Sequence, residues 1–208
     1  MTDALISGLL AGYGVAIPVG AIGVLILGLS ARTSLRVGAG AALGVATADG
    51  LYALVAVLGG AAIASVIAPV ARPLRIVAAI VLLAIAIRVG VTAWRHHRDP
   101  TRVAAAPALA TAGRAFGALL GLTLLNPATV IYFAALVLGH RATDVSADAA
   151  AEGVFVIAAF LASASWQLFL AAGGSALGRY LGGPRGRLAT ALASSLLIMV
   201  LAIRTAAG

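Results

Sequence analysis

Asp49 is the only acidic residue that lies inside a long apolar stretch of this 208-residue chain. If the stretch spans a membrane, insertion of an aspartate at its centre costs roughly 2.5 to 3.5 kcal/mol, and something must compensate. One interpretation is a carboxylate that takes up and releases a proton as its site opens to alternate sides of the membrane. The alternative is a structural ion pair with Arg88, the basic residue inside another apolar stretch. Both interpretations make Asp49 and Arg88 candidate site residues.

A second feature is a repeat of helix-breaking residues. Two apolar stretches, 109 positions apart, carry Gly, Gly and Pro at the same spacing: Gly8, Gly12 and Pro18, then Gly117, Gly121 and Pro127. A proline inside a helix clashes with the carbonyl four residues back, so we expect the Gly14 and Thr123 carbonyls to be freed. Broken backbone at membrane depth is tolerated only where it is buried in protein or lines a wet cavity. Pro18, Asn126 and Pro127 are therefore candidate site residues, with a simple packing kink as the alternative.

Two aromatic residues follow polar residues at helical spacing. Asp49 and Tyr52 align, with a small gap, with Ser163 and Trp166 in the second half of the chain. Residues three apart share a face of a helix, so each polar group would lie beside its aromatic neighbour. We expect Tyr52 and Trp166 to line a substrate path. Aromatic residues that face lipid would fit the same positions.

Composition identifies an integral membrane protein. Hydrophobic residues make up 62% of the chain and charged residues 10%, and the mean hydropathy is +1.12. Soluble domains are about half apolar. The absence of cysteine excludes disulfides and a thiol relay. The net charge of +8 comes from arginines, most of them in short loops, where they attract lipid head groups; this charge predicts a lipid bilayer and no nucleic acid as partner.

The apolar stretches predict an all-α membrane protein with six transmembrane helices. A span needs about 20 mostly apolar residues, and six stretches meet this length approximately: 4–30, 37–60, 74–94, 115–138, 153–174 and 188–203. Residues 1–208 then form a single membrane domain, with three-helix repeats at 1–94 and 114–208 and a cytoplasmic linker at 95–113. Because three is odd, the second repeat would enter the membrane upside down, as in many secondary transporters.

The arginines also predict orientation. Nine lie in the loops after the first, third and fifth spans, namely Arg32, Arg36, Arg95, Arg98, Arg102, Arg114, Arg179, Arg185 and Arg187, against four on the other side, namely Arg72, Arg75, Arg141 and Arg204. Cytoplasmic loops are the ones rich in arginine. We therefore expect a multi-pass protein of the plasma membrane with both termini outside.

Motifs of enzymes and of tightly bound groups are missing from the sequence. No phosphate-binding loop, nucleophile elbow or zinc-protease pattern is present. We expect no enzymatic activity, no cofactor and no metal. The Gly-xxx-Gly pairs at Gly8 and Gly12, Gly117 and Gly121, and Gly40 and Gly44 are assigned to helix packing, and such faces also permit a homodimer.

Four segments together resemble the LysE/RhtB family of amino-acid exporters. They are "AIPVGAIGVLILG" at 16–28, "GAGAALGVATADGLYALVAVLG" at 38–59, "GALLGLTLLNPATVIYFAALVLG" at 117–139 and "SASWQLFLAAGG" at 163–174. They occur in family order and cover both halves. The chain differs from the family in having Ala128 where Asn-Pro-Lys is common, and Arg88 where uncharged residues are usual.

The resemblance implies export of an amino acid or a similar small metabolite, driven by the proton-motive force or the membrane potential. Pro18, Asp49, Asn126 and Pro127 are the site residues that it implies. Two other functions stay open from the sequence: an inorganic cation or metal exporter with the same six-helix plan, and a membrane subunit that transports nothing and packs against a partner protein.

Overall fold

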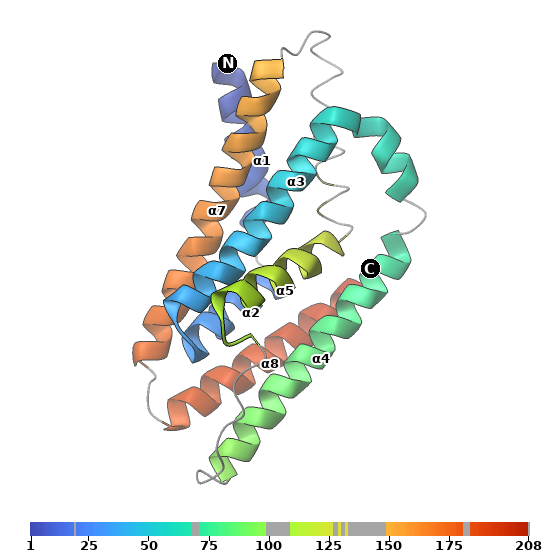
Figure 1. Cartoon of the computed structure of the whole chain (residues 1–208). Coiled ribbons are helices and arrows are strands. Elements are labelled where there is room, and N and C mark those ends of the chain that lie inside the picture. Colours follow the sequence, from blue (N-terminus) through green and yellow to red (C-terminus); the bar gives the residue numbers. More distant parts are fainter. Residues whose placement is uncertain are drawn as a thin grey trace.

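The computed structural model describes residues 1–18, 20–67, 71–98, 109–126, 129, 132, 149–180 and 184–207, and all regular structure in these ranges is α-helical (Figure 1). This confirms the predicted all-α class. The helices are α1 (Thr2–Ala16), α2 (Ala21–Arg32), α3 (Leu35–Ile67), α4 (Ala71–Arg98), α5 (Ala112–Leu124), α7 (Ala149–Tyr180) and α8 (Pro184–Ala207).

The first apolar stretch is broken at the predicted proline. Helix α1 ends at Ala16, α2 begins at Ala21, and the two helices meet at an angle of 76°. Gly20 caps α2 in an extended conformation, and Pro18 lies exposed between the helices. The interruption follows from the missing proline N–H and from the clash of its ring with the preceding turn.

By length and composition, fewer helices than predicted qualify as membrane spans within the described ranges. Residues 35–58 of α3 and the whole of α7 qualify, and the bent pair α1 and α2 makes a third if it is counted as one span. The apolar part of α8 is shorter because charged residues bound it, and α5 has 13 residues. The described helices alone therefore do not establish the predicted six spans.

Two other boundaries differ from those predicted. Helix α3 continues to Ile67, past the predicted end at residue 60, and α4 continues to Arg98, about one turn into the predicted linker 95–113. Alanines near the end of α3 and arginines near the end of α4 favour helix and allow these extra turns. Residues 99–108 of the linker lie outside the described residues, as do residues 127, 128, 130, 131 and 133–138 of the fourth predicted span, 115–138.

Glycines set how closely α1 approaches α7. A side chain on Gly8 would collide with the Phe155 carbonyl, and one on Gly12 would collide with the Ala159 carbonyl. The backbones therefore touch, as in small-xxx-small helix pairs. Because both residue numbers increase together along this contact, α1 and α7 run in the same direction, and α1 lies along the first half of α7 (Figure 1).

A similar close contact joins α3 to α5, and its glycines are on α3. Gly40 lies against the Ala112 carbonyl and Gly44 against the Phe116 carbonyl, so these helices are also parallel. Among the described residues, nothing lies within 4 Å of where a side chain on Gly117 or Gly121 of α5 would begin. The described contacts therefore give no support to a packing role for this pair, whereas Gly40 and Gly44 on α3 permit the close approach.

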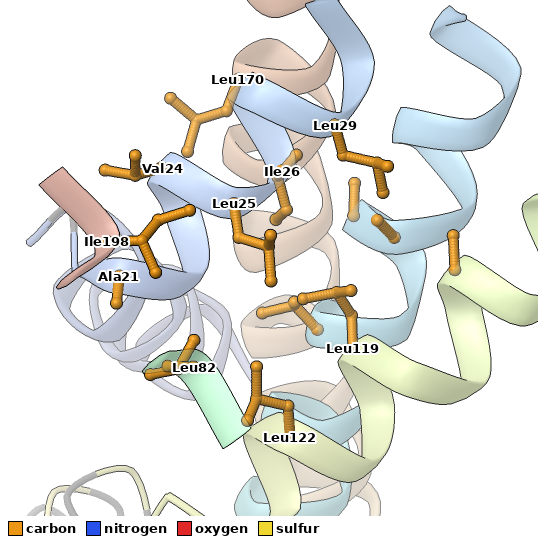
Figure 2. Close-up of a cluster of buried hydrophobic side chains, with 14 of the residues drawn as sticks. Ala21, Val24, Leu25, Ile26, Leu29, Leu82, Leu119, Leu122, Leu170 and Ile198 are labelled. Carbon is orange, nitrogen blue, oxygen red and sulfur yellow. The ribbon is translucent and has the colours of Figure 1, made fainter. Parts of the chain in front are cut away.

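The main core lies where five helices meet around α2. Leu25 and Ile26 of α2 are almost completely buried, and they lie among leucines from α4, α5 and α7 and Ile198 from α8 (Figure 2). Helix α4 packs mainly against α8, on the side of the molecule away from α1 (Figure 1). The core thus fixes the second part of the broken stretch, α2, against α7 and α8.

Candidate functional site

A buried hydrogen bond joins α3 to α7 at the centre of the molecule. The Ser163 hydroxyl donates to the Asp49 carboxylate at 2.6 Å, and both residues are buried, with 0% and 3% of their surfaces exposed. Asp49 thus has a polar partner across the helix crossing. One hydroxyl satisfies only part of a carboxylate's capacity to accept hydrogen bonds.

The two helices that carry this bond run in opposite directions. Asp49 lies by Ser163, Gly50 lies against the Phe160 ring, and Gly38 lies near Ala171, so one residue number rises as the other falls. The crossing therefore brings together the two residues that the sequence aligns between the halves of the chain.

Tyr52 connects the carboxylate face of α3 to the end of α5. Its hydroxyl donates to the Leu124 carbonyl at 2.5 Å, and the residue is 9% exposed. Helix α5 ends at Leu124, so this carbonyl is among those that have no partner within a helix. The tyrosine supplies the partner that the broken helix lacks.

The second predicted break is only partly described. Asn126 is partly buried just beyond α5, whereas Pro127 lies outside the described residues. The prediction that the Thr123 carbonyl is free is wrong, because this carbonyl accepts a hydrogen bond from the Asn126 backbone N–H at 2.9 Å. A tight turn after α5 satisfies this group locally. The prediction for the Gly14 carbonyl is not tested.

A pocket opens beside the break between α1 and α2. It has a volume of about 360 Å³ and is lined by Tyr13, Ser165, Trp166 and Phe169. The Tyr13 and Ser165 hydroxyls are hydrogen-bonded at 2.9 Å, and the Trp166 and Phe169 rings are 5.5 Å apart. The buried Trp166 Nε1 has no partner within the described structure. Pro18 lies five residues after Tyr13, so the break and the pocket are neighbours in the chain.

Arg88 is separate from this group of residues. It is exposed on α4, and no ion pair joins it to Asp49 in the described part of the chain. The alternative interpretation of Asp49 as half of an Asp49–Arg88 pair thus has no support. A role for Arg88 in binding substrate stays a prediction.

Comparison with known proteins identifies the family. The family described as LysE type translocator matches residues 14–207, nearly the whole chain. The chain belongs to the LysE type translocator family. No curated protein and no solved structure matches it. The translocator is thus a membrane transporter, as the sequence indicates, and its family is one of transporters rather than enzymes.

Sequence reasoning missed Gln167 of this translocator. It lies one turn after Ser163 on α7 and is 5% exposed, and its Oε1 atom has no hydrogen-bond partner among the described residues. The sequence did contain a signal for it. Gln167 follows the polar Ser163 by four residues inside an apolar stretch, so both side chains lie on the same face of the helix. Among the described residues, no three His, Cys, Asp or Glu side chains come together as a metal site.

Proposed function

We propose that this translocator exports an amino acid or a similar small metabolite from the cytoplasm as a secondary transporter of the plasma membrane. The observation that carries the proposal is the buried Asp49 carboxylate, held by Ser163 where α3 crosses α7. Ionisable groups inside membrane proteins generally serve transport or proton relay. The proton gradient or the membrane potential is the proposed driving force.

We also propose that the chain spans the membrane six times, in two inverted halves. Asp49 and Ser163 are equivalent in the two halves by sequence, and they touch each other. Two residues related by a two-fold axis touch only near that axis, which supports such an axis at this crossing. The parallel contacts of α1 with α7 and of α3 with α5 also agree with the directions that six alternating spans would have.

Each residue of the group has a proposed role. Asp49 binds the coupling proton and releases it on the other side of the membrane. Tyr52, Asn126 and Trp166 line the path of the solute, and the chain at Pro18 and Pro127 borders this path. The hydrogen bond from Tyr52 to Leu124 supports this, because it ties the carboxylate face of α3 to a broken helix end.

The test begins with the solute. Cells that lack the protein are loaded with amino-acid-containing dipeptides, and the metabolites retained inside are measured with and without the gene on a plasmid. The proposal predicts that one amino acid or a related metabolite accumulates in the deletion strain and is exported again after complementation. Sensitivity to a metal salt without this accumulation would favour a metal exporter. No change in any solute would favour a subunit that transports nothing.

A further inference from the structure

Gln167 presents an unsatisfied acceptor next to the buried carboxylate. Its side chain is 5% exposed, and its Oε1 atom accepts no hydrogen bond within the described structure. Burying an amide without a partner is costly, so native structures rarely leave one in this state. Leu170, three residues further along α7, belongs to the main core cluster of apolar side chains.

The position of Gln167 places this acceptor near Asp49. Ser163 and Gln167 are four residues apart on α7, so their Cβ atoms lie about 6 Å apart on one face of the helix. Ser163 already contacts the Asp49 carboxylate at 2.6 Å. A carboxylate, a hydroxyl and an amide carbonyl therefore gather at one crossing, and all three offer oxygen atoms.

The unmet requirement of this group is positive charge. Asp49 has one hydroxyl partner and no cationic partner in the described part of the chain, and Arg88 is exposed on α4. A small cation bound to both would neutralise the charge and satisfy the acceptor together. A proton on Asp49 would also neutralise the carboxylate, and the acid O–H that results could donate to the Gln167 carbonyl.

We propose that Asp49, Ser163 and Gln167 form a binding site for one sodium ion. Oxygen ligands suit hard cations. A single carboxylate balances one positive charge, whereas a divalent ion would leave excess charge in a medium of low polarity. The described pocket is lined by Tyr13, Ser165, Trp166 and Phe169, and Asp49, Ser163 and Gln167 are not among its lining residues. Sodium and a proton would then compete for Asp49.

The inference rests on the proposed function only where it concerns the use of sodium to drive export. Its test therefore measures the binding of sodium and not transport. Trp166 precedes Gln167 and is one of two tryptophans in the chain. Replacing the other, as Trp94→Phe, leaves Trp166 as the sole reporter. Purified protein in lipid nanodiscs is titrated with NaCl, KCl or choline chloride at constant ionic strength while its emission is recorded.

The site predicts a saturable change in emission with sodium that potassium and choline do not produce. Gln167→Leu and Ser163→Ala should each weaken the apparent sodium affinity about tenfold or more. Ser195→Ala is the matched control, because Ser195 is also a buried serine bonded across helices, to the Ala86 carbonyl at 2.7 Å, and lies on α8. It should titrate like the parent protein.

The outcomes separate this inference from the proposed function. Equal responses to the three salts, or none, in the folded parent protein would overturn the sodium site even if Gln167→Leu failed to fold. Amino-acid export by the same protein would then leave the proposed function standing. A sodium-specific response in a protein that exports no metabolite would support the site and count against the function.

Discussion

At the scale of single residues, the sequence identified the buried acid but not how it is satisfied. Asp49 was predicted because one carboxylate in an apolar stretch is costly. Its partner depends on where α3 crosses α7, which residue spacing within one helix does not determine. The partner that the sequence left open as an alternative was Arg88, which is exposed on α4, and the observed partner is Ser163.

The hydrogen bond between Asp49 and Ser163 is testable by a double-mutant cycle. Asp49→Asn and Ser163→Ala should each destabilise the protein, and the coupling between them should be about 0.6 to 1.7 kcal/mol, as for buried hydrogen bonds between membrane helices. The measurement is unfolding in mixed micelles. Additive effects of the two substitutions would mean that the side chains do not interact.

The hydrogen bond from Tyr52 to Leu124 can be tested by comparing the stability lost when the hydroxyl of Tyr52 or that of Tyr13 is removed. Tyr52→Phe should cost about 1 kcal/mol, because it leaves the carbonyl at the end of α5 without its donor. Tyr13→Phe removes an exposed hydroxyl paired with Ser165 and should cost less. The same unfolding assay measures both, and an equal loss for the two variants would contradict the assignment.

At the scale of elements, sequence predicted the break in the first helix because proline chemistry is local. The interruption at Pro18 needs only the missing N–H and the ring. The role of the glycines is not local. Gly8 and Gly12 pack against α7, but Gly121 at the repeated spacing has no neighbour among the described residues, and the glycines of the contact between α3 and α5 are on α3.

Gly12→Ala and Gly121→Ala test whether the first glycine is in close contact with another helix and the second is not. A methyl group at position 12 would meet the Ala159 carbonyl, so Gly12→Ala should lower stability by about 1 to 3 kcal/mol. No described residue lies near the position of a side chain at Gly121, so Gly121→Ala should be neutral or should stabilise by up to about 1 kcal/mol. Thermal unfolding in detergent distinguishes them, and the reverse order would contradict the packing.

At the scale of the whole molecule, composition was enough to predict a helical membrane protein, and the family match supports this. The number of spans was harder to derive. Counting apolar residues gave six stretches, but helices end where caps, prolines and charged residues stop them, so α5 and α8 offer shorter apolar lengths. The pairing of helices came only from the structure, since hydropathy does not determine which faces meet.

The predicted orientation is accessible to labelling because the chain has no native cysteine. Thr2→Cys places a single thiol at the first residue of α1, and Thr33→Cys places one directly after α2. In intact cells an impermeant maleimide should label position 2 and spare position 33, because arginine-rich loops stay in the cytoplasm. Labelling of position 33 alone would reverse the proposed orientation.

The central claim is that the carboxylate at the crossing of α3 and α7 couples export to a gradient. Its most direct test is flux from proteoliposomes that carry the identified metabolite under an imposed pH gradient or voltage. The account predicts gradient-driven flux for the parent protein, partial flux for Asp49→Glu, and loss of the gradient dependence for Asp49→Asn in protein that is still folded. Gradient-driven flux in Asp49→Asn equal to that of the parent would contradict the account.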